Sequence, residues 1–150
     1  MYQVAARTGG CSAWLIRPTD EWLRDGFWSD ESAAVHSISF QDLIAHGRPA
    51  ALVAHELSNR CLGKKVLCDG GEHDCMWLAM LFAGGGLRPP LLSDYEQFAV
   101  ELATQSECSP EAIFAAEVEA RSRFPTLHRA APDTRRLAET LRLLAGCGEP

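Results

Sequence analysis

The stretch of residues 65–82 constrains the fold more than any other part of the chain. Its first five residues, Lys65–Asp69, have an apolar centre and predict a short buried strand that ends at Gly70-Gly71. A helix should start near Asp74, because apolar residues then recur at helical spacing before three glycines end the pattern: Trp77, Leu78, Leu81 and Phe82. A buried strand followed at once by a helix indicates a protein that mixes the two kinds of element.

The segments on either side fit this layout. Two short apolar segments, Tyr2–Arg7 and Ser12–Arg17, flank Thr8-Gly9-Gly10 and predict a hairpin. Residues 18–30 predict a loop with one helical turn, and Leu91-Leu92 predicts a short edge strand. Helices are expected over residues 32–36, 40–46 (capped by Ser39), 49–61, 95–103, 109–124 and from Pro132 to Leu144. We therefore expect an α/β or α+β fold in one domain of residues 1–150.

The composition supports an ordinary globular domain. The chain has 150 residues, of which 47% are hydrophobic and 23% are charged. Folding at this length removes roughly 68–70% of the unfolded chain's surface from water, so the core needs no disulfide. We find no apolar run near the roughly 20 residues of a membrane helix and no signal pattern, so we expect a cytoplasmic protein that binds no membrane.

The charge limits how the chain can hold nucleic acid. The formal net charge is −6, which argues against binding through a broad basic surface. A confined site with several carboxylates around divalent cations stays compatible with this charge.

Two groups of polar residues are candidates for chemistry. The first, around Asp69, Glu72 and Asp74, lies between the expected strand and its helix, where α/β proteins commonly place ligands. The second is His128 and, five residues later, Asp133 at the start of the last helix. Each group also has a purely structural explanation: carboxylates favour the positive end of a helix dipole, and a loop histidine can bond a backbone carbonyl.

Taken together, these motifs resemble the DEDD superfamily of 3′–5′ exonucleases, in its histidine-bearing (DEDDh) branch. The resemblance lies in the helix that begins His73-Asp74-Cys75-Met76-Trp77, in the His-x4-Asp spacing of His128 and Asp133, and in Val35-His36-Ser37-Ile38-Ser39. It implies an RNase H-like fold with a mixed central sheet flanked by helices.

The resemblance also implies a function, the hydrolysis of terminal phosphodiesters in single-stranded RNA or DNA with two Mg²⁺ or Mn²⁺ ions. Asp74 and Asp133 would be metal ligands and His128 the general base. Arg129 and His36 would be weaker candidates for substrate contacts. Arg129 is also compatible with a solvated helix face. Relatives of this family often dimerise, so a homodimer is a further expectation.

One family motif has no counterpart in this sequence. The family's Asp-x-Glu lies on a first strand before the hairpin, and Met1–Arg7 do not supply it. We therefore expect an amino-terminally incomplete domain without the first strand, whose activity as it stands is open. The alternative is a catalytically inactive RNase H-like module that binds nucleic acid or a protein. A third hypothesis is a small zinc-binding regulator that uses Cys68, His73 and Cys75.

Overall fold

The computed structural model describes residues 3–7, 10–26, 28–125 and 129–147, and for residues 3–7 and Ser32 it describes the backbone alone. The predicted hairpin is confirmed. β1 (Gln3–Arg7) pairs antiparallel with β2 (Cys11–Arg17), with Gln3 opposite Leu15 and Arg7 opposite Cys11. The short β3 (Arg48–Pro49) adds to the other edge of β2 in parallel. Because side chains alternate along a strand, β2 buries Trp14 and Ile16 on one face.

Three short helices connect β2 to β3. They are α1 (Asp20–Arg24), α2 (Asp30–His36) and α3 (Phe40–His46). Ser39 caps α3 as predicted, since its hydroxyl accepts from the Asp42 N–H at 3.0 Å while Asp42 accepts from the Ser39 N–H at 3.2 Å. Gly47 ends α3, and only glycine fits there, because a Cβ atom would collide with the backbone of Leu43 and Arg17. This close approach holds α3 against β2.

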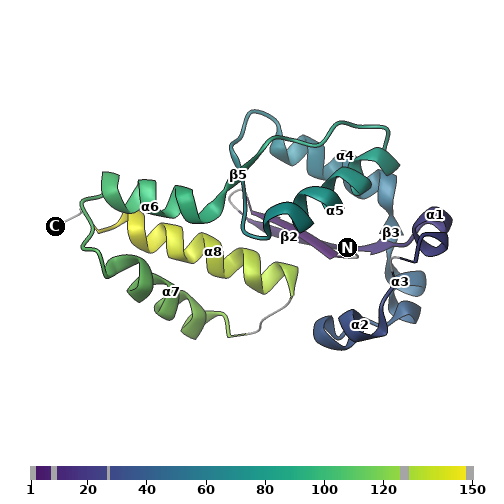
Figure 1. Ribbon diagram of the computed structural model, residues 1–150, viewed down its shortest axis with the longest axis horizontal. Coiled ribbons are helices and arrows are strands. Elements are labelled where there is room, and N and C mark those ends of the chain that lie inside the picture. Colours follow the sequence, from purple (N-terminus) through teal and green to yellow (C-terminus); the bar gives the residue numbers. More distant parts are fainter. Residues whose placement is uncertain (1–2, 8–9, 27, 126–128, 148–150) are drawn as a thin grey trace.

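The central part of the chain is a strand–helix–strand unit preceded by a helix. α4 (Ala50–Cys61) leads into β4 (Val66–Cys68), α5 (Gly71–Gly84) and β5 (Leu92–Asp94), and β4 pairs with β5 in parallel. α4 and α5 pack together beside the hairpin (Figure 1). They form with it the first hydrophobic core, which contains Trp14, Ile16, Trp22, Ala50, Val53, Ala54, Leu57, Leu78, Leu81 and Phe82.

The last part of the chain is a unit of three helices that lie side by side at one end of the molecule (Figure 1). They are α6 (Tyr95–Gln105), α7 (Ala112–Arg123) and α8 (Ala130–Ala145). Their shared core is small and consists of Ala99, Ala103, Ala116 and Leu144, with partly buried neighbours. The amino-terminal half of α8 leaves this unit and packs on the hairpin.

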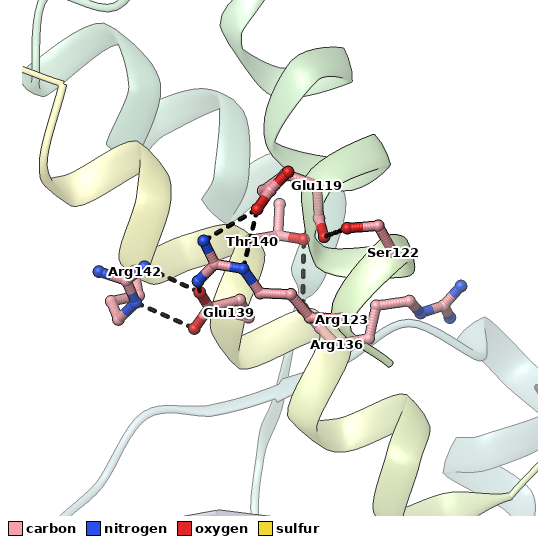
Figure 2. A network of polar contacts seen from close by, with 7 residues as sticks. All are labelled: Glu119, Ser122, Arg123, Arg136, Glu139, Thr140 and Arg142. Atoms are coloured by element: carbon pink, nitrogen blue, oxygen red, sulfur yellow. Dashed lines mark hydrogen bonds and ion pairs between the residues drawn. The ribbon is translucent and has the colours of Figure 1, made fainter. Parts of the chain in front are cut away.

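A polar network joins α7 to α8. Glu139, only 8% exposed, accepts hydrogen bonds from Arg123 on α7 and from both Nε and Nη2 of Arg142, at 2.9 and 2.8 Å. Glu119 holds Arg123 from its other side at 2.9 Å. Figure 2 shows that the Arg136 side chain is directed away from this network.

The expected α/β class is confirmed, and most of the chain is helical. The described strands form two small sheets, β1–β2–β3 and β4–β5, where we expected one central sheet. α5 begins at Gly71, three residues before the expected start, because Gly71 adopts a φ of +57° that glycine allows without strain and that suits a sharp turn. No helix in the described part of the chain is long and apolar enough to cross a membrane.

Candidate functional site

The candidate site lies where the parallel strands β4 and β5 end. Asp69 follows β4 directly, and Tyr95 follows β5 directly. Since the two strands run in parallel, their carboxyl ends meet at the same edge of the small sheet. This is the edge at which open α/β sheets commonly bind ligands.

Asp74 lies in the first turn of α5 and its carboxylate folds back over the turn after β4. A Cβ atom at position 70 would overlap this carboxylate, so glycine at Gly70 leaves the space that Asp74 occupies. The Cys68 thiol donates to the Asp74 carboxylate with a sulfur–oxygen distance of 3.3 Å. Burial raises the pKa of Cys68 to about 11, so the thiol keeps its proton and stays a donor.

The pKa of Asp69 is affected by the other charged side chains of the site. Burial is the main cause that raises the pKa of Asp69, and the negative charges of Asp74 and Asp133 raise this pKa further. The positive charge of Arg136 lowers it. Carboxylates from the β4–α5 turn and from the start of α8 therefore share one electrostatic environment, although Asp69 and Asp133 are far apart in the chain.

α8 contributes one acidic and one basic side chain to this environment. Asp133, in the first helical turn, pairs with Arg136 one turn later at 3.5 Å. The Arg136 side chain is 20% exposed, and its Nε is buried without a hydrogen-bond partner among the described residues. Arg136 thus places a fixed positive charge close to the carboxylates.

Tyr95 connects the end of β5 to α8. The ring is 5% exposed, and its hydroxyl donates to the Leu137 carbonyl at 3.3 Å. Burial raises the pKa of Tyr95, a hydrogen bond with Thr140 lowers it, and the charge of Asp69 raises it. The tyrosine is therefore a neutral hydrogen-bonding group that fixes α8 against the strand ends.

Two of the weaker site predictions, Arg129 and His36, contact each other. The Arg129 guanidinium donates to the carbonyl oxygens of His36 at 2.7 Å and of Ser37 at 3.4 Å. These carbonyls lie at the carboxyl end of α2, where a cation is favoured by the helix dipole. Arg129 therefore has a structural role in joining the start of α8 to α2.

The remaining site predictions have different outcomes. His128 lies outside the residues that the structure describes. His73 and Cys75 are exposed on α5. Within residues 3–7, 10–26, 28–125 and 129–147, no three side chains of the types His, Cys, Asp and Glu form a group that could hold a metal ion. Neither the predicted zinc set of Cys68, His73 and Cys75 nor the three carboxylates Asp69, Asp74 and Asp133 form such a group.

Two residues of this site were not among the site residues predicted from the sequence. For Arg136, only its i,i+3 spacing from Asp133 could have marked it as the partner of that carboxylate. Tyr95 was placed in a helix without a role. Its signal was its position after a second short apolar segment, because parallel strands bring their carboxyl ends together.

Comparison with known proteins adds no relative. No protein-family model, no curated protein and no solved structure matches this chain.

Proposed function

We propose that the chain carries the larger part of a DEDDh-type 3′–5′ exonuclease domain with an RNase H-like fold. The observation that carries the proposal is the position of Asp74, which accepts from the Cys68 thiol at the end of β4. The negative charge of Asp133 raises the pKa of the adjacent Asp69, and we infer that both carboxylates named by the resemblance face this strand end. If Asp74 and Asp133 only stabilised the starts of their own helices, α5 and α8 would not need to begin near the same strand end.

The residues fit a divalent cation in their chemistry. Mg²⁺ and Mn²⁺ prefer carboxylate oxygens, and Asp74 and Asp133 offer them from two separate helices. When bound, such ions supply electrostatic stabilisation for the attacking and leaving oxygens of a phosphodiester. A pair of ions needs further ligands, which the family takes from its Asp-x-Glu strand. We therefore propose that these residues alone hold at most one ion weakly.

The other roles follow from the same placement. His128, five residues before Asp133, would take the proton from the attacking water, as an imidazole with a pKa near neutrality can. Arg136 would offer a positive charge to a phosphate that approaches the carboxylates. A site of this kind needs only the end of one single strand, which agrees with a net charge of −6.

The strand pairing suits the proposed fold. Among the described residues β1 pairs only with β2, and β4 pairs only with β5, so each of β1 and β4 has one edge without a strand partner. We propose that one additional strand pairs with both of these edges and joins the two sheets into a single mixed sheet. In the proposed fold this strand carries the Asp-x-Glu motif.

The test is a nuclease assay on single-stranded RNA and DNA oligonucleotides labelled at the 5′ end. It compares this chain with a version that carries an Asp-x-Glu strand before Met1, each with Mg²⁺ or Mn²⁺. We expect stepwise shortening from the 3′ end by the longer version, and loss of this activity in Asp74→Asn and Asp133→Asn. Asp25→Asn, at the exposed end of α1, is the matched control and should retain the activity.

A second candidate function is an inactive module that binds nucleic acid or a protein. The Arg136–Asp133 ion pair favours it, because the guanidinium already supplies positive charge beside a proposed ligand. Titration with Mn²⁺ separates the candidates. Binding that Asp133→Asn removes supports the exonuclease. Absence of Mn²⁺ binding in the longer version, or trimming that Asp133→Asn leaves unchanged, would overturn it.

A further inference from the structure

Two cysteines meet at the end of the three-helix unit, far from the acidic site. Cys108 lies in the loop between α6 and α7, and Cys147 follows the end of α8. Both use the same acceptor: the Leu144 carbonyl receives the Cys108 thiol at 3.3 Å and the Cys147 backbone N–H at 3.2 Å. Two residues bound to one oxygen atom are necessarily neighbours.

The two thiols lie over the same turn of α8. The Cys147 thiol also reaches the Leu143 carbonyl, at 3.8 Å, so it lies over the same last turn of α8 as the Cys108 thiol. Burial raises the pKa of Cys108 to about 11, and a hydrogen bond between the two thiols raises it as well. Both cysteines are free in this structure.

From this juxtaposition we propose that Cys108 and Cys147 form a reversible disulfide in the folded protein, and that the oxidant is a low-molecular-weight disulfide such as oxidised glutathione. The bond would fasten the end of α8 to the loop between α6 and α7.

The two thiols have different roles in the exchange. Cys147 is exposed, so the oxidant can reach it: its sulfur attacks the oxidant and gives up its proton, which releases one glutathione thiolate and leaves a mixed disulfide on Cys147. The half-buried Cys108 then loses its proton and attacks the Cys147 sulfur, which releases the second glutathione. Two protein thiols are oxidised and one glutathione disulfide is reduced to two thiols.

A disulfide between Cys108 and Cys147 would close a loop of the chain, and this closure restricts the unfolded chain more than the folded one. The bridge spans α7 and α8, and the native chain already places the thiols together, so little distortion is needed. We expect the oxidised protein to unfold at a temperature roughly 5–10 °C above that of the reduced protein.

The experiment treats the folded full chain with oxidised glutathione and maps disulfides by mass spectrometry of non-reduced peptides. We expect one dominant linked pair, Cys108 with Cys147, with loss of two hydrogen atoms, and its reversal by a reducing agent. Cys147→Ser should abolish the link and the rise in unfolding temperature. Cys75→Ser, which removes an exposed cysteine on α5, is the matched control and should leave both unchanged.

Three results would overturn the proposal. The first is a Cys108–Cys147 link no more abundant than links that involve Cys75. The second is a link that forms only in denaturant. The third is an oxidised protein that unfolds at the same or a lower temperature, since the bond would then require a distorted chain.

Discussion

The two hydrophobic cores of this protein differ in the size of their side chains. The first core, between the hairpin and helices α4 and α5, contains large side chains such as Trp14, Trp22 and Phe82. The second core, among α6, α7 and α8, has three alanines among its four fully buried members. Large side chains remove more apolar area from water, whereas alanines let helices approach closely and bury little area each.

The second region supplements its small core with polar contacts. Glu139 on α8 binds Arg123 on α7 and Arg142 on its own helix, and the Cys108 thiol donates to the end of α8. We infer that the stability of the first region depends on apolar volume, and that the stability of the second depends on close helix packing and on charge. Substitutions should show these two contributions separately.

The largest effect is expected in the first core. Phe82 is 1% exposed, and Phe82→Ala should lower the free energy of unfolding by about 3–5 kcal/mol, because it removes apolar contacts and leaves a cavity. Urea denaturation followed by circular dichroism measures this. Phe114 on α7 is 72% exposed, so Phe114→Ala is the control and should stay within about 0.5 kcal/mol. Equal effects at the two positions would contradict the comparison.

The close fit of the second core predicts sensitivity to added volume. Ala120 is fully buried one helical turn after the core member Ala116 on α7, so Ala120→Leu should lower the free energy of unfolding by about 1–3 kcal/mol through overpacking. Ala115→Leu, on the exposed side of the same helix, is the matched control. Calorimetry of both variants decides the point, and a stable Ala120→Leu protein would show that α7 and α8 have spare room between them.

Removing the charge of Glu139 tests the polar bridge. Glu139→Gln keeps the shape but weakens the hydrogen bonds to both arginines, and we expect a loss of about 1–2 kcal/mol in the free energy of unfolding. Glu119→Gln removes a more exposed charge from the same network and should cost less than about 0.5 kcal/mol. A larger loss in Glu119→Gln than in Glu139→Gln would show that the more exposed contact contributes more to stability.

The Glu139 bridge should also depend on pH. Arg142 is the main cause that lowers the pKa of Glu139 in the folded chain. Ionised Glu139 therefore stabilises the protein fully above the unfolded pKa of about 4.3, and this contribution is lost as pH falls through the lower folded pKa. Denaturation at pH 7 and at pH 3 should show a larger difference between wild type and Glu139→Gln at pH 7 than at pH 3. A constant difference would exclude charge as its cause.

The smallest effect concerns the junction between the two regions. Asp94 ends β5 and caps α6, where its carboxylate accepts from the Gln97 N–H at 2.7 Å. Asp94→Ala should lower the free energy of unfolding by about 1 kcal/mol, and Asp94→Asn, which keeps an acceptor, by less. Circular dichroism of both variants measures this, and identical losses would assign the effect to charge instead of capping.

Much of the fold was predictable because its signals are local. The hairpin, the cap at Ser39 and the glycines that end α5 depend on neighbouring residues, and all were predicted from the sequence. The parallel pairing of β4 with β5 depends on segments separated by a helix, so the pattern at Leu91-Leu92 suggested a strand without its partner.

In the candidate site, too, local motifs were predictable and the packing of distant segments was not. Asp74 and Asp133 were named from motifs, but their relation to Asp69 depends on how α8 packs on the strand ends, which no local pattern encodes. Arg129 and His36 were named as substrate contacts, and only the folded chain shows that the arginine binds the end of α2.

The Arg129 contact makes α2 a reporter for the acidic site. Arg129 precedes α8 directly and is bonded to the last carbonyls of α2, so a ligand that shifts Asp133 must either carry α2 with it or break these bonds. Just before α2, the indole of Trp28 packs edge-on against Phe40 with ring centres 5.3 Å apart. The fluorescence of Trp28, once separated from that of the other three tryptophans of the chain, is thus an optical probe for movement at the start of α8.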